Sequence, residues 1–226
     1  MAKLSHCHSL ELGGSTFIVQ EYANGGDLYN QIAPDARGPS MVVAQTWMYQ
    51  LSQALMYMHE RGIVHRDIKP ENILLHDGCI RLCDFGLACL EGTSWAARAP
   101  GTRPYMAPET LAGAHVVLPS QDVWSLGIVL HGILFADLPW QEASRTDAEY
   151  AAYCRTESLA SSPILATPMA ALLHAMLKPN PDQRATMADV FEFFSETRPW
   201  LLVQEQSAVQ ARKGAPGPSL AQVVCG

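Results

Sequence analysis

Eight consecutive residues, from His65 to Asn72, contain the side chains that transfer of a phosphoryl group to a hydroxyl requires. Asp67 can accept the proton of the attacking hydroxyl, and Lys69 can neutralise the oxygens of the moving phosphoryl group. Asn72 offers an amide oxygen, a hard ligand that suits Mg²⁺. Because this reaction asks a protein mainly for positioning and charge neutralisation, the octapeptide predicts a phosphotransferase.

Two further motifs follow this octapeptide along the chain. Asp84-Phe85-Gly86 begins twelve residues after Asn72, and Ala107-Pro108-Glu109 comes later. A single Asp in a loop is often only a turn former. In this order, however, the three elements resemble the signature motifs of the eukaryotic protein kinases.

The resemblance implies a role for each residue of the catalytic machinery. Thr102 matches the threonine that bonds the catalytic Asp and Lys, and Lys69 is typical of the serine/threonine type. Asn72 and Asp84 match the family's Mg²⁺ ligands, so ATP and Mg²⁺ are the expected cofactors. The catalytic residues implied in this way are Asp67, Lys69, Asn72 and Thr102.

The resemblance also implies an ATP site. The run from Thr16 to Tyr22 predicts a strand that leads into the hinge between the lobes, with Gln20 at the gatekeeper position. Asp27 would contact the ribose and a substrate arginine, aided by Glu71, although an acid that begins a helix is an equally good interpretation. The implied ATP-binding residues are Gln20, Glu21, Ala23, Asp27, Leu74 and Cys83.

A third set of residues is expected to hold the site together or to regulate it. Asp122 matches the buried aspartate that anchors the catalytic loop, and Glu109 with Arg184 matches the family's internal ion pair. Arg66 provides the usual pocket for an activation-loop phosphate. The structural residues are His65, Arg66, Phe85, Gly86, Glu109, Asp122 and Arg184, and the candidate phosphosites are Thr93 and Ser94.

No Gly-rich loop, and no strand that carries the ATP lysine, precedes His65. Gly13-Gly14 and Gly25-Gly26 lack the G-x-G-x-x-G spacing, and no strand surrounds Lys3. We therefore expect the N-terminal part of the kinase domain to be missing from this chain. The alternatives are an active kinase, a catalytically inactive binding module, and a fragment of a longer kinase. Missing sheet partners should leave four side chains poorly covered: Leu10, Leu12, Phe17 and Val19.

The fold class expected is α+β, with a kinase-like fold that consists mainly of the helical large lobe and a remnant of the small-lobe sheet. Residues 1–22 would form that remnant (the end of helix C and two strands), 23–204 the large lobe, and 205–226 a disordered tail rich in Ala, Gly, Pro and Ser. Helices are predicted after the caps Ser40, Ser120 and Thr186, and over residues 169–177.

The apolar positions of the first of these helices recur at three- and four-residue intervals, which predicts one buried face. This face comprises Val43, Trp47, Leu51, Ala54, Leu55 and Met58, and Gly62 ends the helix. Short strands are expected at Ile63-Val64, Ile73–Leu75 and Ile80–Cys83, the last two joined by a turn at Asp77-Gly78.

Composition narrows the class of protein. A net charge of −7 argues against non-specific binding to nucleic acid or to acidic membranes, and it fits a basic peptide substrate. The six cysteines form no C-x-x-C pair, which favours a reducing compartment, nucleus or cytoplasm. A metal at His6-Cys7-His8 would lack a second ligand cluster. We expect neither a signal peptide nor a membrane span, and the sequence does not indicate an oligomeric state.

Within the kinase family, the chain most resembles the cell-cycle checkpoint kinases of the checkpoint-one type. Calmodulin-dependent and energy-sensing kinases share much of the same pattern. The resemblance implies protein substrates with Arg upstream of the target Ser or Thr, and a role in cell-cycle or DNA-damage checkpoint signalling. It rests on Glu21-Tyr22, Gly25–Leu28, Ile32–Asp35, Asp122–Leu130, Leu138–Trp140 and Ala170–His174.

Overall fold

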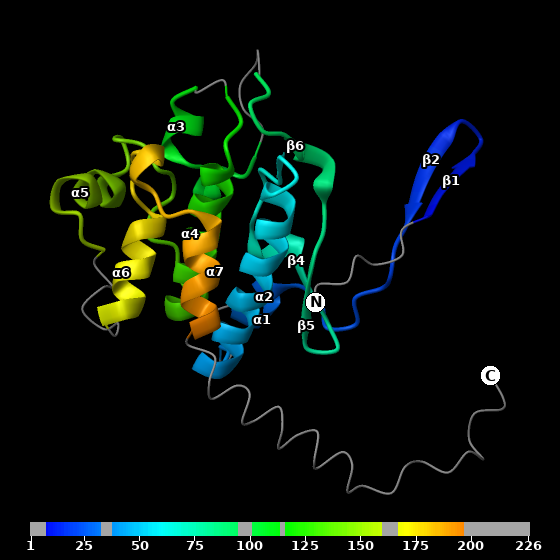
Figure 1. Ribbon diagram of the computed structural model, residues 1–226, viewed down its shortest axis with the longest axis horizontal. Coiled ribbons are helices and arrows are strands. Elements are labelled where there is room, and N and C mark those ends of the chain that lie inside the picture. Colours follow the sequence, from blue (N-terminus) through cyan, green and yellow to red (C-terminus); the bar gives the residue numbers. More distant parts are fainter. Residues whose placement is uncertain (1–7, 33–37, 95–100, 114–115, 160–166, 197–226) are drawn as a thin grey trace, which may run out of the picture.

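A computed structural model describes residues 8–32, 38–94, 101–113, 116–159 and 167–196. The predicted end of helix C at Lys3–His6 and the predicted tail at 205–226 lie outside these residues. The described part is a helical body beside which three small antiparallel strand pairs lie (Figure 1). This arrangement confirms an α+β fold in which helices predominate.

All six strands of the described part precede the long buried helix along the chain. The strands are β1 (His8–Leu12), β2 (Ser15–Val19), β3 (Ile63–Val64), β4 (Ile73–His76), β5 (Cys79–Leu82) and β6 (Cys89–Leu90). The helices are α1 (Leu28–Ile32), α2 (Met41–His59), α3 (Pro108–Leu111), α4 (Pro119–Phe135), α5 (Ala148–Thr156), α6 (Thr167–Met176) and α7 (Met187–Glu196). The pairs are β1–β2, β3–β6 and β4–β5.

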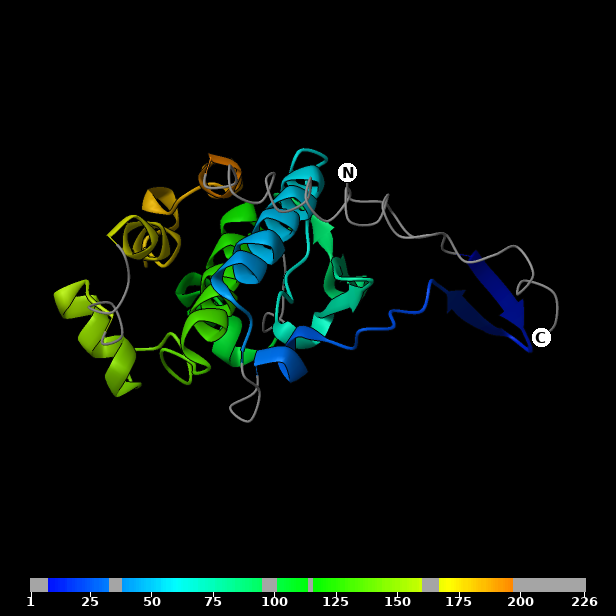
Figure 2. The ribbon, with the colours of Figure 1, turned by 90° about the horizontal axis from the view of Figure 1, so that it is seen from below.

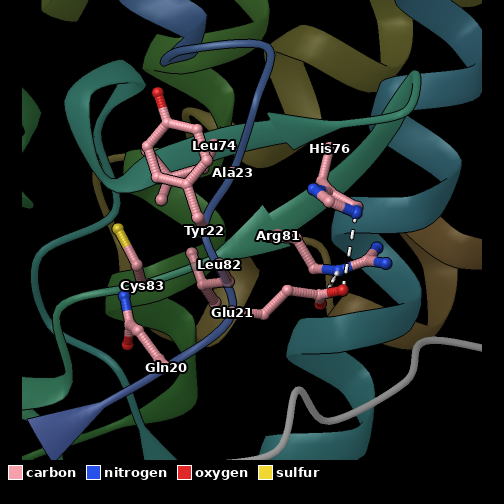
Figure 3. A pocket seen from close by; sticks show the side chains of 9 residues that line it. All are labelled: Gln20, Glu21, Tyr22, Ala23, Leu74, His76, Arg81, Leu82 and Cys83. Atoms are coloured by element: carbon pink, nitrogen blue, oxygen red, sulfur yellow. Dashed lines mark ion pairs between the residues drawn. The ribbon is translucent and has the colours of Figure 1, made fainter. Parts of the chain in front are cut away.

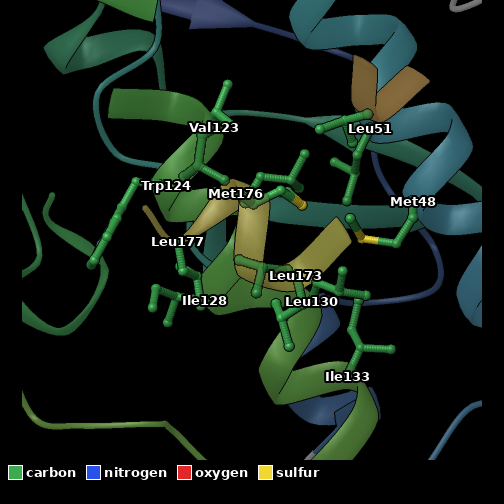
Figure 4. Packing of buried hydrophobic residues seen from close by; sticks show 14 of the residues in the cluster. Met48, Leu51, Val123, Trp124, Ile128, Leu130, Ile133, Leu173, Met176 and Leu177 are labelled. Atoms are coloured by element: carbon green, nitrogen blue, oxygen red, sulfur yellow. The ribbon is translucent and has the colours of Figure 1, made fainter. Parts of the chain in front are cut away.

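The centre of the body is α4, in which every residue from Gln121 to Ile133 is buried. A helix that is apolar on all sides belongs in a core and not at a surface. Helices α2, α6 and α7 pack against it, and Figure 4 shows side chains of α2, α4 and α6 in this packing. This packing gives the site a rigid support, because the catalytic loop lies beside α4.

Helix α2 begins where the sequence predicts. Ser40 is the N-cap, and its Oγ accepts a hydrogen bond from the backbone N–H of Val43 at 3.4 Å. Trp47, Leu51, Leu55 and Met58 are buried, but Val43 is 37% exposed, so the predicted apolar face was wrong at its first position. In this first turn of the helix it is Ala44, the next residue, that is buried in the core.

The predicted cap of α4 was wrong. Leu118 is the N-cap and Ser120 lies inside the helix, since Pro119 takes the first helical position. The fixed φ of proline favours that position. In place of a hydroxyl cap, the Gln121 side chain accepts a hydrogen bond from the Leu118 N–H at 3.5 Å. By contrast, the predicted Thr186–Asp189 capping box is present, with both bonds formed at 2.7 and 3.2 Å.

The β1–β2 hairpin projects away from the helical body in both views (Figures 1 and 2). Leu12, Phe17 and Val19 are 66%, 51% and 48% exposed, as predicted, and Ile18 is 70% exposed. The side chain of Leu10 lies outside the described part. An isolated two-stranded hairpin is marginal in water, so this element contributes little to the stability of the body.

Gly127 is the closest contact between α4 and the end of α6. A Cβ at this position would lie 2.9 Å from Leu177 Cδ2 and 3.2 Å from Met176 Cβ. We expect Gly127→Ala to lower the free energy of unfolding by about 1–3 kcal/mol through overpacking, measured by urea denaturation. Gly132→Ala is the control in the same helix, because its Cβ would lie 3.4 Å from Ile32 Cδ1, an ordinary contact. Equal stabilities for the two variants would contradict the prediction.

Candidate active site

The side chain of Asp122 on α4 holds the catalytic loop by binding two backbone N–H groups of the loop. Its carboxylate is fully buried and accepts hydrogen bonds from the N–H groups of His65 and Arg66, each at 2.8 Å. Arg66 has a φ of 71°, which is costly for a residue with a Cβ. Two charge-assisted bonds offset that strain, so the loop conformation depends on Asp122.

His59, which our sequence analysis did not single out, supports the same carboxylate. Its Nε2 lies 2.8 Å from Asp122 Oδ2, and its side chain is 10% exposed. The one feature of the sequence that could have indicated His59 is that it is the basic residue in the last turn of α2. That turn leads directly to the catalytic loop, so His59 and Asp122 join the two longest helices beneath the site.

His65 connects the catalytic loop to the Asp84 motif. Its Nε2 lies 3.0 Å from the carbonyl oxygen of Cys83, and its Nδ1 accepts a hydrogen bond from the Asp67 N–H at 3.4 Å. These partners assign the proton to Nε2, since a carbonyl can only accept. The ring centroid lies 5.1 Å from that of Phe85, so the two motifs also touch through their rings.

Three side chains converge on the carboxylate of Asp67. Lys69 Nζ lies 2.7 Å from Oδ2, and the hydroxyl of Thr102 donates a hydrogen bond to Oδ1 at 2.9 Å. The ammonium of Lys69 also donates to Thr102 Oγ1 at 2.9 Å. Asn72 Nδ2 donates to Asp67 Oδ2 at 3.0 Å and to its backbone oxygen at 2.9 Å. The four residues predicted to be catalytic therefore form one hydrogen-bonded cluster.

The ionisation of Asp67 is decided by opposing effects. Burial disfavours the charged form and raises its pKa, but the hydrogen bonds of Lys69 and Thr102, the charge of Lys69 and the Asn72 amide lower it. The net result is a pKa below the ordinary value for Asp. Asp67 is therefore a carboxylate at neutral pH, able to orient a hydroxyl and to take up its proton.

The oxygens expected to hold a divalent cation lie close to this cluster. Both bonds donated by the Asn72 amide nitrogen go to Asp67, so the amide oxygen remains for a cation. The Cys83 N–H donates to the Asn72 backbone oxygen at 3.0 Å, which brings the following residue, Asp84, beside it. Asp84 has a φ of 59°, and its Oδ1 accepts from Gly86 N–H at 3.2 Å.

An amide oxygen and a carboxylate fit Mg²⁺ because this ion prefers few protein ligands and fills its other positions with water and phosphate. No group of three or more His, Cys, Asp or Glu side chains suited to a metal occurs in the described part of the chain. The donor set thus fits a metal that is shared with a phosphate ligand and does not fit a closed structural site.

A pocket lies between the segment after β2 and the β4–β5 hairpin (Figure 3). It contains about 300 Å³ of empty space, part of which is open to solvent. Five residues predicted to bind ATP line it: Gln20, Glu21, Ala23, Leu74 and Cys83. Tyr22, which lies in the predicted hinge from Glu21 to Ala23, lines it too, and sequence reasoning missed the other three lining residues: His76, Arg81 and Leu82.

Asp27 is the acid that begins a helix, which was the alternative to a contact with ribose. Its Oδ1 accepts hydrogen bonds from Asn30 N–H at 2.9 Å and from Asn30 Nδ2 at 2.8 Å, so it stabilises the first turn of α1. Its backbone forms a β-bridge with Leu74, but it is not among the residues that line the pocket. A contact between Asp27 and ribose stays a prediction.

Cys83 lines the pocket as a protonated thiol. Burial, and then the charges of Asp84 and Asp27, raise its pKa. Its Sγ also lies 3.4 Å from the Asn72 backbone oxygen, to which the thiol donates. Since the thiolate is the reactive form, the surroundings of Cys83 favour packing over redox chemistry.

Glu109 and Arg184 form the ion pair that the resemblance implies. The bidentate bonds measure 2.7 and 2.8 Å, and the Arg184 side chain is fully buried. Arg184 also donates to the backbone oxygens of Lys178, Ser120 and Pro179 at 3.0, 2.8 and 3.3 Å. All five N–H donors of the guanidinium are thereby used, and the pair ties the activation segment to the start of α4.

The candidate phosphosites lie on a short extended segment. The Thr93 backbone oxygen accepts a hydrogen bond from Val117 N–H at 3.1 Å, and Ser94 forms a β-bridge with Val116. Ser94 is exposed and Thr93 partly buried. Arg66 Nη1 donates to the Leu87 backbone oxygen at 3.5 Å. Phosphorylation at Thr93 or Ser94 stays a prediction.

Comparisons with known proteins agree with this geometry. Residues 5–194 match the model of the protein kinase domain family. The chain is 39% identical to the serine/threonine-protein kinase chk-1 of Caenorhabditis briggsae. The alignment covers 83% of this chain and 38% of that protein. It is 36% identical to the serine/threonine-protein kinase chk1 of Schizosaccharomyces pombe, in an alignment that covers 82% of this chain and 37% of that protein.

More distant serine/threonine kinases match as well. CBL-interacting protein kinase 4 of Oryza sativa is 33% identical over 97% of this chain and 53% of its own length. The chain thus spans between about a third and a half of these relatives. No helix among the described residues is long and apolar enough to cross a membrane. By the family match and the similarity to the chk1 proteins, this chain belongs to the protein kinase family and is similar to its checkpoint-one serine/threonine kinases.

Proposed function

We propose that this chain carries the catalytic part of an ATP-dependent serine/threonine kinase, which transfers the γ-phosphate to Ser and Thr hydroxyls of protein substrates. The observation that carries the proposal is the cluster of Lys69, Thr102 and Asn72 on the carboxylate of Asp67. A module that only bound partners would have no physical need for an ionised Asp, a cation and a metal-ligand amide within hydrogen-bond distance of one another.

Each residue has a distinct task in this mechanism. Asp67 orients the substrate hydroxyl and accepts its proton as the oxygen attacks. Lys69 stabilises the charge on the oxygens of the transferred group, and Thr102 keeps Lys69 and Asp67 in register. Asn72 and Asp84 would hold Mg²⁺, which neutralises phosphate charge when it is bound.

The pocket of Figure 3 is the proposed place of the adenine. Backbone groups of Glu21 to Ala23 would meet its edge, and Leu74 would lie beneath its face. Exposed Glu71 supports a preference for substrates with an upstream Arg, because it supplies negative charge beside the catalytic loop.

The setting that we propose is cell-cycle or DNA-damage checkpoint signalling, in the nucleus or cytoplasm. Four free cysteines support a reducing compartment: Cys79, Cys83, Cys89 and Cys154.

Transfer of labelled γ-phosphate from Mg-ATP to an Arg-containing serine peptide tests the proposal, with Asp67→Asn as the matched control. Wild-type transfer well above the control supports a kinase. Equal rates, together with tight binding of a partner protein, would favour the inactive binding module instead.

The hydroxyl of Thr102 gives a second test in the same assay. Thr102→Val keeps the shape of the side chain but removes its bonds with Asp67 and Lys69. A bond to a charged group contributes about 1.5–3 kcal/mol, so the loss of even one of them from the transition state should lower kcat by roughly 10- to 100-fold. Thr102→Ser, which keeps the hydroxyl, should retain most of the activity. A valine variant with wild-type kcat would exclude the positioning role.

A further inference from the structure

The segment that follows β2 is fastened to the β4–β5 hairpin just beyond the pocket. Gly25 N–H donates to the backbone oxygen of Leu75 at 2.8 Å, and Leu75 N–H donates back to Gly26 O at 2.8 Å. Next to them, Asn24 Nδ2 donates to Asp77 Oδ1 at 2.8 Å, and Asp77 N–H donates to Asn24 Oδ1 at 3.1 Å. We call these four reciprocal bonds the hinge clasp.

The shape of the β4–β5 turn fixes one half of the clasp. Asp77 and Gly78 have φ values of 49° and 76°, and His76 pairs with Cys79 across the turn. Two central residues with positive φ define the tight hairpin turn in which Asp-Gly and Asn-Gly are favoured. The backbone of Asp77 is therefore held in one conformation, and its side chain and N–H both reach Asn24.

The other half of the clasp depends on close approach of the two backbones. A Cβ on Gly25 would lie 2.8 Å from both Cβ and O of Leu75, a distance that side chains do not tolerate. Gly25 has no positive φ in this structure. Its lack of a side chain is therefore required by contact with Leu75, and not by the conformation of its own backbone.

Charged side chains of the pocket add little to this attachment. His76 Nε2 and Arg81 Nε lie 3.4 and 3.7 Å from the Glu21 carboxylate, and Glu21 is 44% exposed. Ion pairs at such distances, with one partner largely in solvent, contribute little. Arg81 Nε and His76 Nδ1 are moreover buried without a hydrogen-bond partner in the described part. The four bonds of the clasp are thus the stronger connection.

The clasp adjoins the pocket on both sides. Asn24 directly follows Ala23, which lines the pocket, and Leu75 directly follows Leu74, which lines it from β4. If either segment shifts at the clasp, the distance between Ala23 and Leu74, and with it the width of the pocket, therefore changes. Positioning errors on this scale reduce binding even when every contact residue is present.

We propose that the hinge clasp sets the separation between the backbone of residues 21–23 and Leu74, and that Asn24 and Asp77 are positioning residues for nucleotide binding. The inference rests on the proposed function, in that the ligand of this pocket is taken to be a nucleotide. Neither Asn24 nor Asp77 is among the residues that line the pocket, so both act through the segments that they hold.

Calorimetric titration of the full chain with Mg-AMP-PNP tests the proposal through a graded set of variants. Asn24→Ala removes both side-chain bonds and is expected to weaken binding by about three- to tenfold. Asp77→Gly keeps the turn and the N–H bond to Asn24, so a smaller loss of about two- to threefold is expected. Asp77→Asn suits the same turn and retains an acceptor oxygen, so its affinity should stay within about twofold of wild type.

Two further measurements separate positioning from loss of stability. Asn180→Ala deletes a comparable exposed bond, from Asp182 N–H in another turn, and should bind as wild type does. Peptide transfer by Asn24→Ala should show a higher KM for ATP with unchanged kcat, and its thermal midpoint should equal that of Asn180→Ala.

The inference is overturned if wild type binds AMP-PNP and Asn24→Ala binds it equally well. It is equally overturned if affinity merely follows the thermal midpoint across all four variants. A wild-type chain that binds no nucleotide contradicts the proposed function itself, and the clasp proposal with it. These failures are distinguishable, because only the last one affects wild type.

Discussion

Replacing Asp67 with Asn is expected to reduce kcat for peptide phosphorylation by about 10²–10⁴-fold, the usual contribution of a positioned general base. The variant keeps the size of the side chain and one oxygen that can accept from Thr102. It loses the negative charge that Lys69 contacts at 2.7 Å. It also places an amide nitrogen where Lys69 and Asn72 donate, so at least one donor loses its acceptor.

Nucleotide binding and folding of this variant serve as its controls. Asp67 is not among the residues that line the pocket of Figure 3, so the affinity for Mg-AMP-PNP should change by less than about threefold. The thermal midpoint should fall as well, because Asp67 is buried and a donor beside it loses its acceptor. A variant that folds, binds nucleotide and transfers phosphate at the wild-type rate would remove Asp67 from the mechanism.

The largest effect on stability is expected for Arg184→Met. Breaking a buried ion pair by removing one partner typically costs about 3–5 kcal/mol, because the other charge remains buried and unpaired. Here the loss also leaves the carbonyl oxygens of Lys178, Ser120 and Pro179 without this donor. We expect the upper part of that range, measured as the free energy of unfolding in urea.

A double variant isolates the contribution of the charge. Glu109→Gln combined with Arg184→Met removes the stranded carboxylate and should recover part of the stability lost in Arg184→Met alone. The Arg103–Glu142 ion pair offers a matched exposed comparison: Arg103→Met should change stability by less than about 1 kcal/mol. If Arg184→Met and Arg103→Met were equally stable, the buried pair would have no special role in holding the activation segment.

The sequence by itself determined the local features of this protein. Side-chain caps such as Ser40, the Thr186–Asp189 box and the Asp77-Gly78 turn act over a few residues, so a short stretch of sequence suffices to predict them. The order of the short motifs around Asp67 and Asp84 pointed to the kinase family for a similar reason. Their chemistry depends on residue types at close spacing.

Prediction was wrong where a distant contact or a neighbouring residue outweighed the local preference. Ser120 has the chemistry of a cap, but Pro119 begins the helix one residue earlier. Val43 fits the apolar period of α2, yet it is exposed while the next residue, Ala44, packs into the core. Periodicity records which residues could be buried, and packing decides which of them are.

The resemblance to the kinases implied that Asp122 anchors the catalytic loop, but residue types and spacing by themselves did not indicate which distant residues meet. Asp122 lies 57 and 56 positions from the two N–H groups that it holds, and His59 joins them from another helix. Asn24 and Asp77 are 53 positions apart, and nothing in the type or spacing of either residue indicates that they pair. Contacts of this kind form only when α4 and the β4–β5 hairpin have taken their places, because their geometry comes from the packed core and not from local propensity.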